Sequence, residues 1–313
     1  MLQVSCEIEP QACCELWQQM IPAQKLTDLW DVRECFDRHY RRKLFFVVAR
    51  EGGQVIGFLP LSWITEKEYY GYFPGEIWQG KTWLEQNRLI ARDQDVLEGM
   101  LAWLNDQQIP YHLRYLVDSS LSHLVSASVD EIGYLFLPPE IDYSMDNYFS
   151  KFSRKSIKTI KKEIQVFKSR GVDFRLDQTD DFELMVKMNI DRFGQTSYFA
   201  DERFTGSFRE LMYFLQRKGW LRIVTAIVAG EPAAVDLGAV YDDVYTLLAG
   251  GTHVDYPGIA KVINFFHMER ACEMHFKEVD FLCGNFSWKT LFRLSARPLY
   301  LLTNLKEIKE EVC

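Results

Sequence analysis

The stretch between Tyr245 and Lys289 constrains the fold of this chain of 313 residues more than any other. Residues 245–251 form an apolar run whose β-branched and aromatic side chains predict a buried strand. A turn follows at residues 255–258, and over residues 259–275 the apolar side chains recur on one face of a helix. Residues 279–282 predict the next strand. A strand, a helix packed on a sheet and another strand predict a mixed α/β fold.

The start of that helix has the features of an anion-binding site. The first backbone N–H groups of a helix have no partner inside it, and the helix dipole adds partial positive charge there. A glycine in the turn lets an anionic group approach the backbone closely. We expect a cofactor-binding site that could hold a pyrophosphate, formed by Gly251, Gly258, Ile259, Ala260 and Lys261. A plain strand–turn–helix packing unit is the alternative, because a single Pro-Gly turn is a common feature.

The residues after the second strand resemble a known family. Residues 280–289 read D-F-L-C-G-N-F-S-W-K. This ending resembles the FemABX-like branch of the GNAT acyltransferases, which includes the CelD-type acetyltransferases, where the ending usually reads G-D-x-x-Y-K. Gly284, Trp288 and Lys289 match the motif, with Trp in place of Tyr. Asn285 stands where the family has an acid.

Other features extend this resemblance along the chain. Gly258 and Ala260 stand for the last two small residues of the GNAT acyl-CoA loop, Q/R-x-x-G-x-G/A. The resemblance covers most of residues 151–297 and, more faintly, the first half. It implies two tandem GNAT-like domains, each a twisted mixed sheet flanked by helices. Residues 1–145 would be a degenerate domain on the acceptor side, and residues 146–313 would include the acyl-donor site.

The resemblance also implies an enzyme, an N- or O-acyltransferase of the acetyltransferase type. It would move an acyl group from acyl-CoA, with acetyl-CoA as the first choice, to an amine or hydroxyl. The acceptor would be anionic or linked to a saccharide or nucleotide, in polysaccharide or cell-envelope biosynthesis. Two alternatives stay open. One is an aminoacyltransferase that takes aminoacyl-tRNA, as FemABX-like enzymes of peptidoglycan bridging do, and the other is a catalytically inert binding module, to which Asn285 points.

Both halves of the chain contain a hairpin of apolar strands. In the first half, residues 44–50 and 54–61 flank the turn Gly52-Gly53. In the second half, residues 220–228 and 232–241 flank an Ala-Gly-Glu turn. Predicted helices precede each hairpin, and a strand, a helix and a strand follow it. We therefore expect the second half to repeat the plan of the first, without a residue repeat.

Residues 151–170 carry eight Lys or Arg side chains against one acid, Glu163. Their apolar residues keep a helical spacing, and Asn147 or Ser153 could cap the helix. The basic face predicts a patch for an anionic acceptor, and tRNA suits it less well because the chain has a net charge of −8. A solvated face balanced by acids of the other domain is the alternative. The candidate acceptor-binding residues are Arg154, Lys155, Lys158 and Lys162.

Acyl transfer requires a base for the acceptor's proton, donors for the developing oxyanion and an acid for the leaving group. Asp236 is the candidate base, because it lies in an otherwise apolar strand. A structural acid paired with a cation is the alternative. Tyr256 or Tyr245 is the candidate acid, and both are also ordinary core or turn aromatics. Lys289 is expected to contact a phosphate or the carbonyl oxygen, because it matches the family motif.

The remaining patterns argue against several other classes. Neither a G-x-S-x-G elbow nor a Ser-His-Asp order is present, which argues against a covalent serine mechanism. The six histidines are scattered and none forms H-E-x-x-H, so we expect no metal. Seven cysteines without C-x-x-C, and no secretory signal, favour reduced thiols in the cytoplasm. No apolar run is long enough to span a membrane.

Overall fold

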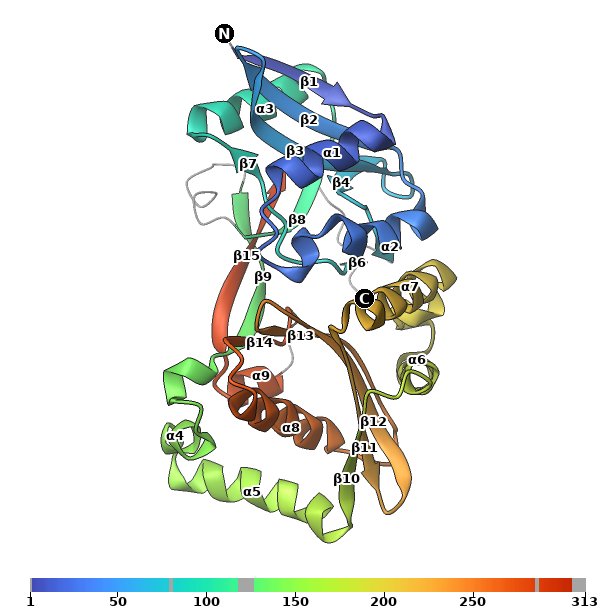
Figure 1. Ribbon diagram of the computed structural model, residues 1–313, viewed down its shortest axis with the longest axis vertical. Helices are drawn as coiled ribbons and strands as arrows, with labels where there is room; N and C mark the ends of the chain where they lie inside the picture. Colours follow the sequence, from blue (N-terminus) through green and yellow to red (C-terminus); the bar gives the residue numbers. More distant parts are fainter. Residues whose placement is uncertain (1, 79–80, 118–126, 285–286, 306–313) are drawn as a thin grey trace. The chain divides into compact units, whose positions relative to one another are not determined.

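The computed structural model describes residues 2–78, 81–117, 127–284 and 287–305 (Figure 1). Helices and strands alternate along these ranges, which confirms the predicted mixed α/β fold. The chain forms two compact units: unit 1 comprises Met1–Ile132 and Pro298–Cys313, and unit 2 comprises Gly133–Arg297. From the sequence we expect a boundary after residue 145. The units divide after Ile132 instead, and the last strand returns to unit 1.

Unit 1 is a mainly antiparallel sheet with helices packed on it. Its helices are α1 (Pro10–Met20), α2 (Trp30–Tyr40), α3 (Gln94–Asp106) and the 3-10 turn η1 (Leu26–Asp28). Its strands are β1 (Gln3–Glu7), β2 (Leu44–Glu51), β3 (Gln54–Ile64), β4 (Tyr69–Tyr72), β5 (Ile77–Trp78), β6 (Lys81–Thr82), β7 (Ile90–Ala91) and β8 (His112–Leu116). Two more strands, β9 (Ala127–Phe136) and β15 (Ser295–Thr303), carry the chain from one unit to the other.

The main sheet of unit 1 has the order β1-β2-β3-β4, with β7 also paired to β3. Gly52 and Gly53 join β2 to β3 with φ of 57° and 85°. Two consecutive positive φ values are typical of the type I′ turn of a two-residue hairpin, which confirms the predicted hairpin. Residues 300–303 of β15 pair with β8 in an antiparallel register.

An aromatic core holds unit 1 together. Trp17, Phe46, Phe58 and Phe73 are each at most 1% exposed. The ring centroids of Trp17 and Phe73 are 5.6 Å apart, and those of Phe46 and Phe58 are 5.5 Å apart. Leu302 of β15 is completely buried in the same core. Burying one such side chain stabilises the fold by about 1.5–3 kcal/mol, so the last strand is an integral part of unit 1.

Unit 2 is a second sheet, covered by helices on both faces. Its strands are β10 (Val172–Leu176), β11 (Leu221–Val228), β12 (Glu231–Tyr241), β13 (Val244–Thr252) and β14 (Glu278–Asp280). Its helices are α4 (Met145–Ser150), α5 (Arg154–Ser169), α6 (Asp181–Phe193), α7 (Glu202–Lys218), α8 (Ile259–Glu273) and α9 (Ser287–Leu291), with the 3-10 turns η3 (Pro138–Ile141), η4 (Gly194–Thr196) and η5 (Tyr198–Ala200).

The strands of unit 2 follow the order β10-β11-β12-β13-β14, and Leu135 and Phe136 of β9 pair with the far side of β14. Neighbouring strands from β10 to β13 are antiparallel, whereas β13 and β14 are parallel. Helices α6 and α7 lie over one face of this sheet and α8 lies over the other (Figure 1). The β11–β12 hairpin, β13 and α8 are at the positions that the sequence predicts.

The basic helix α5 packs on α8 through its apolar stripe. Its N-cap is Ser153, one of the two predicted caps, whose Oγ accepts the N–H of Ser156 at 3.2 Å. Ile157, Ile160 and Ile164 pack against a core that also contains side chains of α8. The polar and charged face of α5 is therefore directed away from the sheet.

Candidate active site

Strands β13 and β14 diverge and leave one edge of β13 open. They pair at three positions: Val244↔Glu278, Tyr245↔Val279 and Thr246↔Asp280. β14 ends there, whereas β13 continues to Thr252, paired only with β12 among the described residues. We call the unpaired side of residues 247–252 the open edge. An extended ligand can pair with such an edge as an added strand.

Helix α8 begins just beyond the open edge. Its N-cap is Gly258, with φ of 94°, which has no side chain to cap the first turn. The N–H groups of Ile259 and Lys261 donate to the carbonyls of Tyr256 and Gly258, both at 3.1 Å. In the described part of the chain, the N–H groups of Gly258 and Ala260 form no hydrogen bond. Two of the four expected backbone donors therefore remain for an anion.

Two cations lie near this helix start. The Lys261 ammonium forms a 2.6 Å ion pair with Glu163, the single acid of α5. The Arg170 guanidinium lies 5.2 Å from the centroid of the Tyr256 ring, and no ion pair to Arg170 occurs within the described ranges. Arg170 is therefore better placed than Lys261 to add positive charge for a bound anion, which the sequence pattern did not indicate.

A hydrogen-bonded chain of three side chains runs beneath α8. Asp236 Oδ2 is 3.0 Å from His267 Nε2, and His267 Nδ1 is 3.0 Å from the Tyr245 hydroxyl. His267 is completely buried and Tyr245 is 3% exposed, whereas the Asp236 side chain is 14% exposed. Burial and then the Asp236 charge raise the pKa of the Tyr245 phenol, so the phenol keeps its proton. Asp236 is thus the end of the chain that reaches solvent.

The adjacent glycines Gly250 and Gly251 make room on opposite faces of the sheet. A Cβ on Gly250 would overlap Oδ1 of Asp236, which lies over this residue. A Cβ on Gly251 would overlap the backbone carbonyl of Met185 in α6. The Gly250 carbonyl also accepts the amide of Asn189 at 2.8 Å. Gly250 therefore accommodates the candidate base, and Gly251, expected to contact a cofactor, accommodates α6.

The Lys289 side chain is buried and directed toward the main chain. Its ammonium donates to the carbonyls of Phe281, Leu282 and Cys283 at 3.0, 2.9 and 2.7 Å. These contacts match the three protons that a lysine ammonium can donate. Lys289 thus stabilises the turn after β14. Its motif position predicts a different contact, to a phosphate or to the carbonyl oxygen of the substrate. Asn285, the residue that replaces the family's acid, lies outside the described residues.

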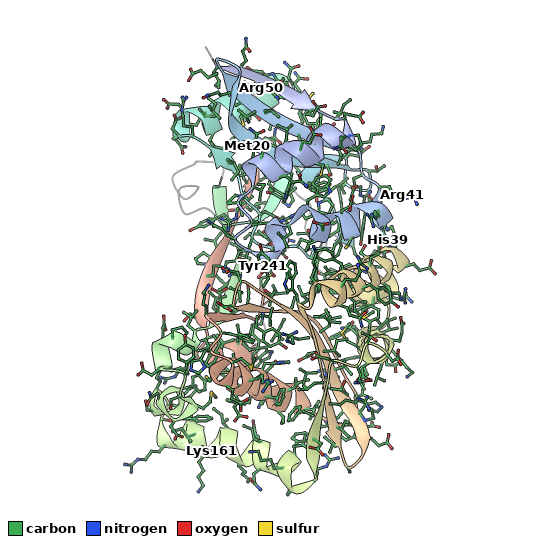
Figure 2. The ribbon with its side chains drawn as sticks, in the orientation of Figure 1. Met20, His39, Arg41, Arg50, Lys161 and Tyr241 are labelled. Atoms are coloured by element: carbon green, nitrogen blue, oxygen red, sulfur yellow. The ribbon has the colours of Figure 1, made fainter. Side chains whose placement is uncertain are left out.

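The predicted acceptor-binding residues lie together on the exposed face of α5. None of them forms an ion pair within the described ranges: Arg154, Lys155, Lys158 and Lys162. Lys161, labelled in Figure 2, lies on the same helix with its ammonium 5.1 Å from the centroid of the Phe149 ring. The structure therefore confirms an exposed basic helix face, while its role stays a prediction.

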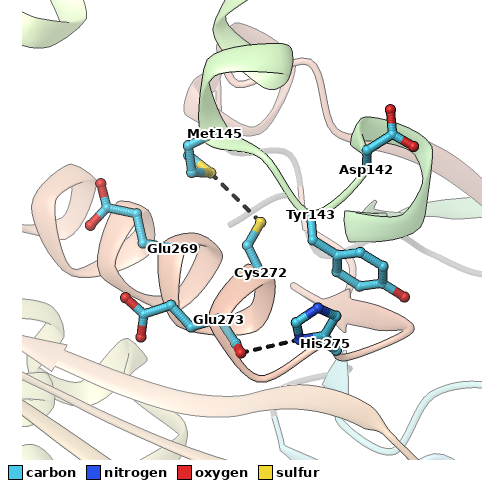
Figure 3. Close-up of a pocket in the computed structure, with 7 residues that line it drawn as sticks. All are labelled: Asp142, Tyr143, Met145, Glu269, Cys272, Glu273 and His275. Carbon is cyan, nitrogen blue, oxygen red and sulfur yellow. Dashed lines mark hydrogen bonds between the residues drawn. The ribbon is translucent and has the colours of Figure 1, made fainter.

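A pocket of about 450 Å³ lies near the C-terminal end of α8 (Figure 3). It is acidic and contains none of the predicted site residues; its lining is Asp142, Tyr143, Met145, Glu269, Cys272, Glu273 and His275. Burial raises the pKa of Glu269, and it raises the pKa of Cys272 to about 11. The pocket is separate from the open edge, which lies toward the other end of α8. No cluster of His, Cys, Asp or Glu in the described residues could hold a metal ion.

In unit 1 the chain's own backbone occupies the space beside β8. β8 follows α3 there as β14 follows α8 in unit 2, but the chain's own backbone covers one edge of β8. The N–H of Asn87 donates to Tyr115 O at 2.9 Å, and the N–H of Val117 donates to Asn87 O at 3.0 Å. The buried Arg33 guanidinium holds this segment through Asn87 Oδ1, at 2.7 Å. This edge of β8 is thus filled, whereas the edge of β13 in unit 2 is open among the described residues.

His267 is the candidate residue that the sequence patterns did not reveal. It lies four residues after Ile263 and four before Ala271, in the apolar stripe of α8. A buried imidazole needs hydrogen-bond partners. A histidine within the apolar stripe was therefore the signal that a polar partner lies beneath the helix. Its partners come from β12 and β13, and only the folded sheet brings them together.

Comparisons with known proteins identify a family domain and several similar folds. Residues 154–290 match the family model of the acetyltransferase (GNAT) domain. FemX has 10% identity and a TM-score of 0.58, over 96% of this chain and 96% of its own. L-PGS from Bacillus licheniformis has 9% identity and a TM-score of 0.59, over 97% of this chain and 94% of its own. A tandem GNAT protein from the clavulanic acid biosynthesis pathway has 9% identity and a TM-score of 0.53, over 98% of this chain and 100% of its own. No curated protein matched the sequence.

Residues 154–290 therefore form an acetyltransferase (GNAT) domain, and the whole chain has a fold similar to those of FemX and L-PGS. The resemblance in the sequence and the predicted pair of tandem GNAT-like domains are confirmed. This domain identifies the protein as an acyltransferase. Within the described ranges, no helix combines the length and the apolar character needed to cross a bilayer.

Proposed function

We propose that this protein transfers an acyl group from acyl-CoA, with acetyl-CoA as the first candidate, to an amine or hydroxyl of an anionic or saccharide-linked acceptor. The observation that carries the proposal is the open edge of β13, which leads to the uncapped start of α8. A chain of amide groups can pair with an open strand edge, and a pyrophosphate can bind a helix N-terminus. Acyl-CoA contains an amide chain and a pyrophosphate in this order.

The donor's pyrophosphate would bind the free N–H groups of Gly258 and Ala260, with Arg170 adding positive charge. Ile259 and Lys261 would contribute through the helix dipole, since their N–H groups already have partners. Gly251 belongs to the open edge, where the absence of a side chain keeps the strand close to α6.

The reaction would be a direct attack on the bound thioester. The acceptor nitrogen or oxygen bonds to the carbonyl carbon, the C–S bond breaks and CoA leaves as a thiolate. Asp236 accepts the acceptor's proton. The thiolate takes its proton from solvent, because Tyr256 lies beside Arg170 at the pyrophosphate end of the donor. Lys289 acts by holding the turn after β14 through the carbonyls of residues 281–283. Asp236 finally releases its proton to solvent, which restores the base.

We place the acceptor's anionic group on the exposed face of α5, whose four predicted residues have no ion pairs in the described part of the chain. A phosphorylated or nucleotide-linked saccharide fits this charge, and such acceptors suit a cytoplasmic step of polysaccharide or cell-envelope assembly. Unit 1 has its own edge filled, so we assign the donor to unit 2 and an acceptor-side role to unit 1.

Calorimetric titration with acetyl-CoA tests the donor site through two matched variants. Gly258 and Gly230 have φ of 94° and 87°, so a side chain at either position is strained to a similar extent. Gly258→Glu places a carboxylate at the proposed pyrophosphate site, and we expect it to weaken binding by at least about tenfold, or 1.4 kcal/mol. Gly230→Glu, in the β11–β12 turn, should bind like the parent. Equal losses in both variants, or no binding by the parent, would contradict the proposal.

Aminoacyl-tRNA is a second candidate donor, favoured by the exposed basic face of α5. If tRNA binds there, affinity should fall steeply with salt, because each phosphate contact releases counterions. Lys158→Glu should then lower the slope of log affinity against log salt by about one, whereas Lys67→Glu, on an exposed turn of unit 1, should not. Binding that ignores salt, or equal effects of the two reversals, would exclude this donor.

A further inference from the structure

We propose that His267 and Tyr245 are positioning residues that present one oxygen of Asp236, Oδ1, as the base of the acyl transfer. The inference rests on the proposed function, since it explains how Asp236 would be held for that role. Its basis is the chain of hydrogen bonds beneath α8 together with the space that Gly250 leaves over β13.

Tyr245 determines which nitrogen of His267 carries the proton. The phenol is buried at the end of the chain, with its oxygen 3.0 Å from Nδ1. A protonated phenol can donate to the unprotonated nitrogen of a neutral imidazole. When Nδ1 accepts this bond, the imidazole's own proton is on Nε2. Neutral His267 is therefore the Nε2–H tautomer.

The Nε2–H group then engages one oxygen of Asp236 and leaves the other free. Nε2 and Oδ2 are 3.0 Å apart, which suits an N–H group donating to a carboxylate. The opposite tautomer would place a nitrogen lone pair against that carboxylate. No other hydrogen bond to Asp236 occurs in the described residues, so Oδ1 keeps its lone pairs for a substrate proton.

Gly250 decides where the free oxygen lies. It is directly opposite Asp236 in the β12–β13 pairing, and Oδ1 occupies the space that a Cβ would fill. Gly250 is also part of the open edge, along which the donor is proposed to lie. The free oxygen is thus above the strand that would carry the thioester, and not in the sealed core with His267.

The step balances without any further reactant. The acceptor's N–H or O–H proton moves to Oδ1 of Asp236 as the acceptor atom bonds to the thioester carbonyl carbon. The C–S bond then breaks and its electron pair leaves with CoA. His267 and Tyr245 keep their protons throughout, and their contribution is to hold Oδ2 so that Oδ1 faces the reacting atoms.

The tautomer of His267 can be measured without any substrate. Long-range nitrogen–proton NMR spectra of the full chain, labelled with ¹⁵N at histidine, distinguish a protonated ring nitrogen from an unprotonated one. We expect His267 to carry its proton on Nε2, and Tyr245→Phe to move the Nδ1 resonance as its hydrogen bond is lost. Tyr148→Phe is the matched control, because Tyr148 is also 3% exposed and donates elsewhere, to Phe292 O. A proton on Nδ1 in the parent, or an Nδ1 resonance unmoved by Tyr245→Phe, would overturn the proposal.

A kinetic measurement separates positioning from mere packing. CoA released from acetyl-CoA, with water as the acceptor, is quantified by chromatography. We expect Asp236→Asn and His267→Leu each to lower kcat about 100-fold with little change in KM. His267→Gln should recover much of that loss, because its amide can donate to Oδ2. Equal activity of the Gln and Leu variants would show that packing alone matters and would refute the positioning role.

The two proposals can fail separately. If acetyl-CoA does not bind the parent while His267 shows the Nε2–H tautomer, the proposed donor is wrong. The proposed positioning of Asp236 then still holds for another acyl donor. If acetyl-CoA binds and Gly258→Glu weakens it while His267 carries its proton on Nδ1, the donor site stands and the positioning of Asp236 is wrong.

Discussion

The imidazole of His112 should make the stability of unit 1 sensitive to mild acid. His112 is on β8 and is 9% exposed, and its buried Nδ1 forms no hydrogen bond among the described residues. Burial, reinforced by the charge of Arg114 and partly offset by Asp130, lowers its pKa from 6.5 to about 4. His112 is therefore neutral in the folded protein at pH values where an unfolded chain would protonate it.

The sign and size of the effect follow from proton linkage. Between pH 6.5 and pH 4 the unfolded state binds a proton that the folded state does not, so the free energy of unfolding falls as the pH falls. Each pH unit in this window costs about 1.4 kcal/mol, which gives a total of about 3 kcal/mol. Above the window the full stability is present, and below it both states are protonated and the loss stops growing.

His112→Leu removes the titrating group while keeping an apolar side chain of similar size. Urea unfolding, followed by tryptophan fluorescence between about pH 7.5 and about pH 4, should show that the variant loses about 3 kcal/mol less than the parent. His253→Leu is the control, because the His253 side chain is 41% exposed and its removal should leave the parent's pH profile unchanged. Parallel profiles for the parent and His112→Leu would refute the linkage argument.

Four further substitutions test contacts described above. Gly250→Ala should abolish acyl transfer but cost at most about 2 kcal/mol of stability, because only the Asp236 side chain must move. Gly251→Ala should cost about 3 kcal/mol of stability, because the new methyl group pushes α6 away. Equal melting temperatures of the two variants would contradict this contrast. Lys289→Met should cost about 2–4 kcal/mol in urea unfolding, since three carbonyls lose their donor, and an unchanged midpoint would count against the contact. Arg33→Met should destabilise unit 1 by a similar amount, about 2–4 kcal/mol by the same assay, because Arg33 donates to two carbonyls and to Asn87; full stability would disprove its role.

The features that could be predicted from the sequence have local causes. The pair Gly52-Gly53 specifies the hairpin turn whatever surrounds it, because both residues need positive φ. Ser153 followed by an apolar stripe specifies the start and the buried face of α5. Gly258 after a strand specifies where α8 begins. In each case the physical reason lies within a few residues of the feature.

The features that could not be predicted depend on partners far along the chain. His267 meets Asp236 across 31 residues, and its apolar neighbours on α8 do not indicate which strand it faces. Lys289 was identified by its motif, but its carbonyl partners are set by how the chain reverses after β14. The pairing of Tyr300 with Leu116 joins segments far apart in the sequence, so the return of the last strand to unit 1 could not be predicted either.

The return of β15 to unit 1 has a consequence for how the protein is made. Residues 300–303 pair with β8, and Leu302 completes the core of unit 1. A ribosome releases all of unit 2, which ends at Arg297, before it releases these residues. Although nascent domains usually fold in order from the N-terminus, here the second unit can finish first. Until translation reaches residue 303, β8 has an exposed edge that a chaperone or another nascent chain could occupy.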